Sequence, residues 1–399
     1  MNSSDFDDFA RAFSKSDDAT VAPEVVITRV AIMGGGKDAR CLAALCLAQG
    51  LEVVLFSAYS AELDVLRKAQ AIPLRGAGPI GSFHVDQKAG PSIQTTSAID
   101  TAVMDADAVF LTGPVHKQRT YAMVLADHLC DGQIVVLPNA RSFAAVEAAW
   151  LLRTGGCLAD LTLVDMVGLS YWIDESPSAL TLSEVSSVPV ATLPDRRPAV
   201  IAALQAFLPG LEPTHSALHS GFVDASAAVE CPALILGGSA ISPGGPHVPD
   251  GAVPLAQNNS FRNLIGPDHI ALIDVLWSER CRVAACFGVR EMPKTDAILT
   301  RVAGEANGAG ARPVPAQSEA RALLRCGAIG SLAPLASAAR IAGIDVPMTH
   351  AMLAQISAIV DGDLKSAGRR LDSIGVTANN LDEARSHINQ IVKRVRHGQ

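Results

Sequence analysis

The chain has 399 residues, of which 49% are hydrophobic, and carries a formal net charge of −8. This length exceeds what one hydrophobic core usually supports, so we expect two domains. No uninterrupted apolar run approaches the length needed to span a bilayer, which argues against a membrane protein. No cluster of Lys and Arg is interleaved with aromatic residues, so we expect no nucleic-acid surface, and a small-molecule ligand fits better.

The cysteines and the N-terminus bear on location. Eight cysteines are scattered without a Cys-x-x-Cys pair, which argues against a metal site and against a disulfide framework. Residues 1–24 are polar and acidic and lack the hydrophobic segment of a signal peptide. We therefore expect a disordered N-terminal arm on a cytoplasmic protein.

An apolar strand over residues 29–33 runs into glycines and then into an Ala- and Leu-rich helical stretch. This arrangement predicts the first β-turn-α unit of a dinucleotide-binding fold. Gly34 permits a tight turn, Gly36 has no Cβ to obstruct a diphosphate, and Ala39 lets the helix approach the strand. A glycine-rich turn that binds nothing is the alternative. The residues expected to contact NAD or NADP here are Gly34, Gly35, Gly36, Lys37 and Ala39.

Strands and helices alternate through the first half. Strands are predicted at 51–56, 93–96, 108–112, 133–137 and 161–164, and helices at 61–70, 98–105, 118–129 and 143–152. The alternation implies a doubly wound Rossmann-type α/β domain with a parallel sheet, which we place at residues 25–205. The stretch 72–81 is Gly- and Pro-rich, and the stretch 180–193 is expected to add strands or to bridge to the next domain.

Ligands of such sheets bind at the carboxyl ends of the strands. Ser57, Gly113, Pro114 and Asn139 follow strand ends, so we expect them to contact the cofactor. Arg141 stands in the same crevice and could bind a substrate carboxylate through two hydrogen bonds. A surface salt bridge is the alternative for this arginine.

The residue after the second strand bears on the choice between NAD and NADP. NAD-selective enzymes commonly place Asp or Glu there, whereas this chain has Ser57. The first acids, Glu62 and Asp64, already belong to the next predicted helix, and Arg67 lies too far along it to bind a 2′-phosphate. The turn therefore predicts a weak preference for NADP(H), or use of both cofactors.

Beyond residue 268 the sequence consists of long helices rich in Ala, Leu and Ile. They are predicted at 268–287, 317–343, 347–361 and 380–397, and Gly, Pro, Ser and Asn accumulate at 208–222 and 237–260. We expect residues 206–399 to form a mainly α-helical domain for substrate binding and dimerisation. The protein is accordingly expected to be a homo-oligomer, most simply a homodimer.

Several stretches, in order along the chain, resemble the opine dehydrogenase family of the octopine and nopaline type. They lie at 34–39, 93–107, 113–114, 131–138, 273–289, 342–347 and 368–375. The resemblance implies an NAD(P)-binding domain followed by an all-helical domain. It also implies an enzyme that reduces the imine of an α-keto acid and an amine or amino acid with hydride from a nicotinamide cofactor.

Members of that family use a histidine and an aspartate of the helical domain as acid and base. This chain departs from that pattern, because the stretch 230–237 contains no histidine and Trp277 stands in place of the aspartate. His247 and Asp274 could replace the pair, since Asp274 lies one helical turn before Trp277. The alternatives are an exposed loop histidine and a surface carboxylate.

Further candidates surround this pair. His116 follows a strand end and is a third catalytic candidate near the nicotinamide, with an ordinary solvent contact as the alternative. The resemblance places Asp165 and Tyr171 where the family has residues that line the site. Glu279 and Arg280 are expected to form an interdomain ion pair.

Three functions stay open. An opine-type dehydrogenase with a rearranged acid-base pair is favoured. The missing family pair instead favours a dinucleotide-binding sensor or structural protein that has lost catalysis. A 2-hydroxy acid or ketopantoate-like dehydrogenase is the third, although its usual lysine and glutamate are not visible here.

Overall fold

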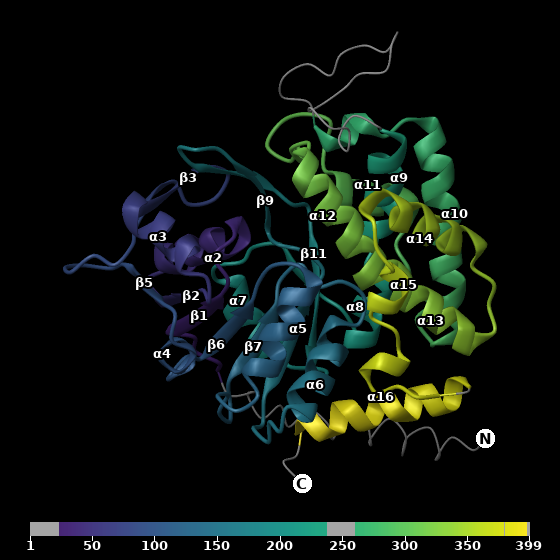
Figure 1. The fold of residues 1–399 in the computed structure, drawn as a ribbon, viewed down its shortest axis with the longest axis horizontal. Helices are drawn as coiled ribbons and strands as arrows, with labels where there is room; N and C mark the ends of the chain where they lie inside the picture. Colours follow the sequence, from purple (N-terminus) through teal and green to yellow (C-terminus); the bar gives the residue numbers. More distant parts are fainter. Residues whose placement is uncertain (1–23, 238–259, 379, 397–399) are drawn as a thin grey trace, which may run out of the picture.

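The computed structural model describes residues 24–237, 260–378 and 380–396, and these form two domains that lie side by side (Figure 1). The first domain contains both β-sheets, and the second consists of helices. The fold class predicted from the sequence is therefore confirmed.

An eight-stranded sheet forms the centre of the first domain, in the order β12-β11-β8-β7-β6-β1-β2-β5. Every neighbouring pair from β5 to β8 is parallel, and β11 is antiparallel to β8. Because the strand order reverses beside β1, a crevice forms at the carboxyl ends there. The strands are β1 (Arg29–Met33), β2 (Glu52–Phe56), β5 (Ile93–Thr96), β6 (Ala108–Leu111), β7 (Ile134–Leu137), β8 (Thr162–Met166), β11 (Val188–Leu193) and β12 (Leu211–Pro213).

Helices cover both faces of this sheet, so its central strands are buried continuous apolar runs. One face packs on α2 and α7, and the other on α4, α5 and α6. The helices of this domain are α2 (Lys37–Ala48), α3 (Ser60–Ala69), α4 (Ile99–Val103), α5 (Val115–Val124), α6 (Ala144–Thr154) and α7 (Pro198–Gln205).

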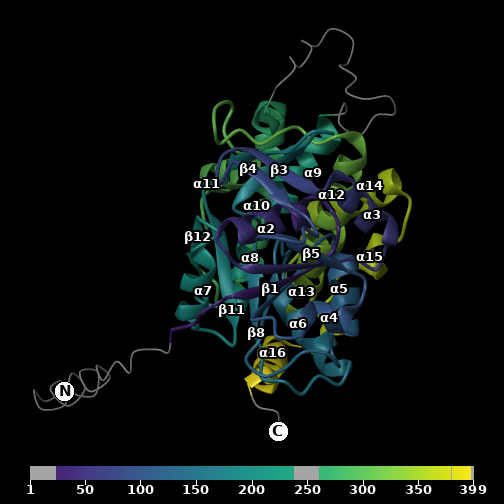
Figure 2. The same ribbon diagram turned by 90° about the vertical axis from the view of Figure 1, so that its left-hand side faces the viewer.

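A second sheet, in the order β4-β3-β10-β9, covers α2 (Figure 2). Its strands are β3 (Ala71–Gly76), β4 (Gly81–His84), β9 (Tyr171–Glu175) and β10 (Leu180–Glu184). The sequence did not predict β3 and β4, because Gly and Pro residues occur in and between these strands. Gly76 has φ +85° and lies against the backbone of Leu182, so a close approach between strands requires the glycine.

The helical domain contains four helices that the sequence did not predict. Two of them lie in the 208–236 region. The sequence did not predict α9 because this helix is buried on nearly all sides and therefore lacks an amphipathic pattern. A π-helical turn at Ala328–Leu332 joins α12 to α13. The helices are α8 (Ala217–Val223), α9 (Ser226–Leu236), α10 (Pro267–Cys286), α11 (Thr295–Ala303), α12 (Gln317–Gly327), α13 (Ala333–Ala342), α14 (Pro347–Val360), α15 (Leu364–Ala367) and α16 (Leu381–Arg396), with short 3₁₀ turns at Phe261–Leu264 and Asp372–Ile374.

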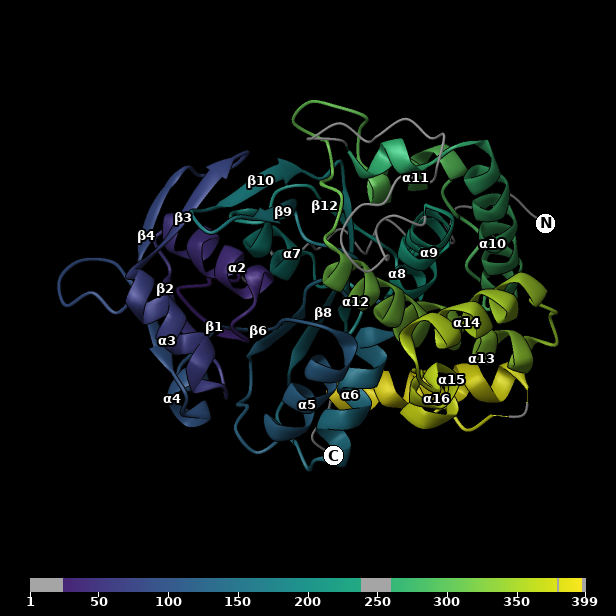
Figure 3. The same ribbon diagram turned by 45° about the horizontal axis from the view of Figure 1, so that its top comes forward.

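One helical stretch is long and apolar enough to cross a membrane by length and composition alone. It covers Gln317–Ala342, and 72% of its most apolar window is buried inside the protein. Figure 3 shows α12, the first part of this stretch, at the junction of the two domains. Burial of this kind is typical of a core helix.

The domain boundary lies later than residue 205. The strand β12 pairs in parallel with β11, so the large sheet continues to Pro213. At the C-terminus, α16 packs against α6 of the first domain. The C-terminal helix therefore returns to the first domain.

The two domains share one hydrophobic core. Phe143 of the first domain meets Phe222 with ring centroids 5.1 Å apart, and Phe222 meets Phe287 of α10 at 5.4 Å. Beside this core, the buried Arg280 donates to the hydroxyl of Ser142 at 2.9 Å and to that of Ser331 at 2.8 Å. A guanidinium group thus joins the 141–143 loop to the helical domain.

Replacing Arg280 by Met is expected to lower the free energy of unfolding by about 3–5 kcal/mol, because it leaves the buried partners without their cation. Urea denaturation measures this loss. Arg282→Met is the matched control on the same helix, since Arg282 is exposed, and it should cost less than about 1 kcal/mol. Equal losses in the two variants would contradict an interdomain role for Arg280.

Candidate active site

The glycine turn between β1 and α2 has the geometry of a diphosphate cradle. Gly34 has φ +127°, and a side chain there would collide with the hydroxyl of Thr112. By contrast, a Cβ at Gly36 would meet no atom of the described residues within 4 Å, so it would project into open space. Gly36 is also the N-cap of α2 and makes no side-chain capping bond. The first N–H groups of α2 therefore have no side-chain cap, the arrangement that suits an anion at the start of a helix.

The turn after β2 differs from the sequence expectation in one respect. Ser57 is fully buried and donates to Glu62 Oε2 at 2.6 Å, and Glu62 Oε1 lies 3.4 Å from Lys117 Nζ. The carboxylate of Glu62 turns back from α3 over Gly35. A carboxylate therefore does lie at the end of the crevice beside β2, contrary to the expectation that Glu62 lies away from it in the next helix.

A cleft of about 940 Å³ runs from the cofactor crevice to the helical domain. Four of the predicted site residues from strand ends lie in it, as does Tyr171 of β9. The residues of the first domain that line it are Lys37, Asp38, Gly113, Pro114, Val115, Asn139, Arg141, Leu169 and Tyr171–Glu175. Those of the helical domain are Glu230, Arg312–Glu319, Ala322, Leu323 and Cys326.

Three charged side chains meet inside this cleft. Glu230 Oε1 accepts a hydrogen bond from Arg312 at 2.8 Å, and Glu230 Oε2 lies 3.1 Å from Nη2 of Arg141. All three side chains are nearly buried. Burial by itself would lower the pKa of Arg141, but the carboxylates of Glu230 and Asp224 raise it above its usual value. The cluster therefore brings two guanidinium groups and one carboxylate together inside the cleft.

Two hydrogen-bond donors, one in this cluster and one beside it, have no partner among the described residues. They are Arg141 Nη1 and Trp172 Nε1, and both are buried. An adjoining cavity of about 50 Å³ shares Arg141, Trp172 and Glu230 with the cleft. The Arg312 guanidinium lies 4.7 Å from the Trp172 ring centroid and 4.3 Å from that of Phe261. Stacking on two aromatic rings fixes the orientation of Arg312.

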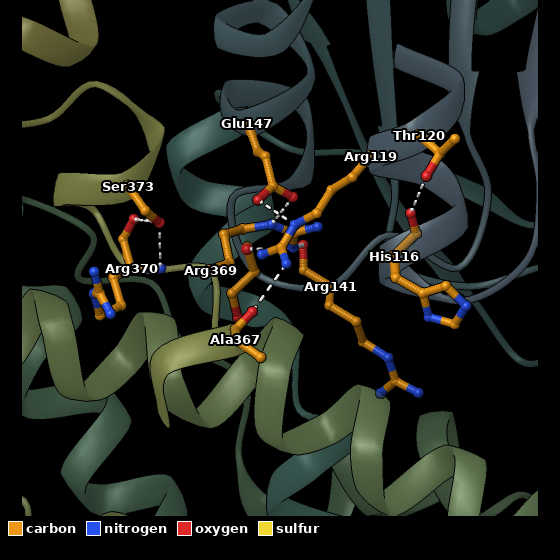
Figure 4. Close-up of polar contacts among 10 residues, drawn as sticks. His116, Arg119, Thr120, Arg141, Glu147, Ala367, Arg369, Arg370 and Ser373 are labelled. Atoms are coloured by element: carbon orange, nitrogen blue, oxygen red, sulfur yellow. Dashed lines mark hydrogen bonds and ion pairs between the residues drawn. The ribbon is translucent and has the colours of Figure 1, made fainter. Parts of the chain in front are cut away.

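A buried network positions the backbone of Arg141 (Figure 4). Arg369 donates to the carbonyl oxygen of Arg141 at 3.1 Å and to Glu147 at 2.6 Å, and Arg119 donates to the other oxygen of Glu147 at 2.7 Å. The side chain of Arg141 points away from this network, toward the cleft. Its guanidinium group thus reaches Glu230.

The first turn of α2 contributes a titratable pair to the cleft. Lys37 forms an ion pair with Glu319 of α12, which spans the two domains. Asp38 accepts a hydrogen bond from the Asn139 amide at 2.8 Å. Burial raises the pKa of the Asp38 carboxyl above its usual value, although Lys37 and Asn139 oppose the shift. Asp38 can therefore hold a proton closer to neutral pH than an exposed aspartate can.

The predicted catalytic trio does not assemble among the described residues. Asp274 is exposed on α10 and accepts a hydrogen bond from Thr295 at 2.5 Å, so it does not replace the family aspartate in the cleft. His116 is exposed on α5 and is not among the residues that line the cleft. Burial and the neighbouring Lys117 lower the pKa of His116. His247 lies outside the described residues.

Two other predictions need correction. Asp165 is buried behind the cleft and accepts a hydrogen bond from Ser220 at 2.9 Å, so it supports the fold and does not line the site. Glu279 and Arg280 do not pair with each other. Instead, Glu279 accepts hydrogen bonds from the backbone of Met348 and Thr349 at the start of α14. Their adjacent positions on α10 direct the two side chains to different neighbours.

Sequence reasoning missed Glu230, Arg312, Asp38 and Glu62. For Glu230 a signal existed, because it is the single charged residue in the apolar stretch 226–236. Such a residue is buried only when it is paired. The others had no local signal, since their partners lie far along the chain. Within the part of the chain that the structure describes, no group of three or more His, Cys, Asp and Glu could hold a metal ion.

Comparisons with known proteins bear out the resemblance found in the sequence. No protein-family model matches the chain. An opine dehydrogenase from Arthrobacter sp. (strain 1C) is 22% identical over 363 residues, which cover 87% of this chain and 95% of that protein. Octopine dehydrogenase, solved with NADH and L-arginine, superposes with a TM-score of 0.65 at 15% identity, covering 89% of this chain and 97% of the other. D-mandelate dehydrogenase with NADH reaches a TM-score of 0.60 at 12% identity, over 84% of this chain and 99% of the other.

The buried Asp165 predicts a pH dependence of stability. Burial raises the pKa of its carboxyl to about 7, from roughly 3.9 in an unfolded chain. Between these values the folded state binds more protons than the unfolded state, so the contribution of Asp165 to stability falls as the pH rises. Asp165→Asn removes this titration. As the pH rises from 4 to 8, the free energy of unfolding of the variant should therefore increase by up to about 4 kcal/mol relative to that of the unmodified protein.

Urea denaturation of both proteins at several pH values tests this sign. The exposed Asp160→Asn variant is the control, and its stability relative to the unmodified protein should hardly change with pH. A difference between Asp165→Asn and the unmodified protein that stays constant from pH 4 to pH 8 would contradict a raised pKa.

Proposed function

We propose that the protein is an NAD(P)-dependent oxidoreductase of the opine dehydrogenase type that acts on a small substrate with a carboxylate, such as a keto acid or its imine. The observation that carries this proposal is a single cleft that joins the free N-terminus of α2 to the Arg141–Glu230–Arg312 cluster. A nicotinamide dinucleotide bound in the crevice supplies or accepts a hydride. The dehydrogenases to which the chain is similar support this class of reaction.

The charge of the cluster supports a carboxylate ligand. Arg141 and Arg312 share the carboxylate of Glu230, so these three nearly buried side chains together carry one excess positive charge, although the Asp224 carboxylate also acts on Arg141. A substrate carboxylate would compensate this charge and accept hydrogen bonds from Arg141 Nη1 and Trp172 Nε1, which lack partners among the described residues. Glu230 keeps both arginines in place before the substrate binds.

Asp38 is the group that we propose to carry the proton. It lines the cleft, Asn139 orients it, and burial raises its pKa. A neutral carboxyl there can donate a proton as hydride reaches carbon, and it would not repel a neighbouring diphosphate. The predicted role of His247 as acid remains a prediction.

Binding of the cofactor tests the first part of the proposal. Gly36→Val should abolish NADH and NADPH binding, because the new side chain would fill the open space beside Gly36 where the diphosphate is proposed to bind. The backbone of Gly36 has φ −71°, which any residue adopts, so the melting temperature should change little. Calorimetric titration of the unmodified protein and of the variant measures both affinities. An unmodified protein that binds neither dinucleotide would refute the proposal.

Turnover tests the second part. NADH consumption should require both an α-keto acid and an amine or amino acid if the reaction is of the opine type. Consumption with a keto acid alone would instead indicate a 2-hydroxy acid or ketopantoate-like dehydrogenase, an alternative that the structural likeness to D-mandelate dehydrogenase favours. Tight dinucleotide binding without turnover of either kind would indicate a sensor protein that has lost catalysis.

Arg312→Met should raise the KM for the carboxylate substrate by roughly 10²-fold, or about 3 kcal/mol, because it removes one of the two cations of the cluster that the substrate carboxylate would face. Arg321→Met is a matched control, because Arg321 binds the carbonyl oxygen of Ile359 and does not line the cleft. Equal KM values in the two variants would count against the carboxylate site. Steady-state kinetics at saturating cofactor provide both numbers.

Two further properties stay predictions from the sequence. We expect a homodimer in the cytoplasm, since the helical domain provides surface for association. Light scattering on the purified protein tests the oligomeric state, and fractionation of cells tests the location.

A further inference from the structure

A carboxylate stands at the adenosine end of the crevice, although no acid follows β2 directly. Glu62 belongs to the first turn of α3, and its side chain turns back over the glycine turn. A Cβ at Gly35 would lie only 2.8 Å from the Cβ of Glu62, so Glu62 can lie there because Gly35 has no side chain. The carboxylate is thus held beside the ends of β1 and β2. In this class of sheet, the adenosine ribose of a dinucleotide binds at that place.

Ser57 fixes the carboxylate in this position. The backbone N–H of Tyr59 donates to the Ser57 hydroxyl at 3.1 Å, so the hydroxyl directs its own proton to Glu62 Oε2 at 2.6 Å. Ser57 is fully buried and reaches a ligand only through Glu62. The serine that replaces the usual acid after β2 therefore positions an acid that comes from the next helix.

The nearby cations do not offer a site for a phosphate. Lys117 Nζ lies 3.4 Å from Glu62 Oε1 and 5.2 Å from the ring centroid of Tyr59. Arg67 donates to Thr95 at 3.0 Å and to Asp86 at 3.4 Å. Because Lys117 is paired with Glu62 and Arg67 with Asp86, this end of the crevice carries no uncompensated positive charge among these groups.

We propose that Glu62 makes the protein selective for NAD(H) over NADP(H). Its carboxylate accepts hydrogen bonds from the adenosine ribose hydroxyls, and it repels a 2′-phosphate by like charge. This inference rests on the proposed function, because it requires a dinucleotide at the glycine turn. It reverses the preference that the sequence alone predicted.

Dissociation constants for NADH and NADPH, measured by calorimetric titration, test the inference. The unmodified protein should bind NADH at least tenfold more tightly, which corresponds to about 1.4 kcal/mol. Glu62→Gln keeps the shape of the side chain and removes its charge, so NADPH binding should strengthen about tenfold while NADH binding weakens a few-fold. Lys117→Met removes the cation that offsets Glu62, so it should widen the preference for NADH.

Asp64→Asn is the matched control for Glu62→Gln. Asp64 lies two residues further along α3, its side chain is 58% exposed, and its nearest cation is Arg67 at 4.0 Å. Removing this acid should leave the ratio of the two dissociation constants unchanged. Circular dichroism of each variant confirms that the fold is intact.

Two results would overturn the inference. One is an unmodified protein that binds NADPH as tightly as NADH, and the other is an unchanged ratio in Glu62→Gln. Failure of the unmodified protein to bind either dinucleotide is a different result, because it overturns the proposed function and this inference with it.

Discussion

The structure depends on the loop at residues 141–143, which is clamped between the two domains by buried guanidinium groups. Arg280 reaches it from α10 through the hydroxyl of Ser142, and Arg369 reaches it through the carbonyl oxygens of Arg141 and Ser142. Asp224 accepts from the backbone and the hydroxyl of Ser142. Buried charges are tolerated only when such partners surround them, so the loop has one stable arrangement. That arrangement directs Arg141 into the cleft.

This clamp makes the cleft a preformed site. The aromatic chain from Phe143 through Phe222 to Phe287 continues the core of the first domain into the helical domain, so the interface is apolar as well as charged. A large rigid interface of this kind opposes a wide hinge motion between the domains. The positions of Arg141 and Arg312 relative to the glycine turn are therefore set before any ligand arrives, which lowers the entropy lost on binding.

The departure from the opine dehydrogenase pattern has a physical counterpart in the cleft. In the stretch where the family has a histidine, α9 presents Glu230, and two arginines hold its carboxylate. A carboxylate that is paired in this way holds the two cations in place. The proposed proton donor, Asp38, is instead a partly buried cleft residue whose carboxyl pKa is raised by burial.

The sequence by itself determined the Rossmann domain, the glycine turn and the long helices, because these features follow from local periodicity and from conformations that only glycine allows. It also indicated Asn139 and Arg141, since residues after parallel strands meet at one edge of the sheet. Only the tertiary structure decided the rest. The hydrogen bond between Arg312 and Glu230 joins residues that are 82 positions apart in the sequence, and the one between Arg369 and Glu147 joins residues that are 222 positions apart. Glu62 is close in sequence to Ser57, but the direction of its side chain over Gly35 follows from the packing of α3 against the crevice. Contacts between distant segments, and the rotamers they select, leave no local pattern.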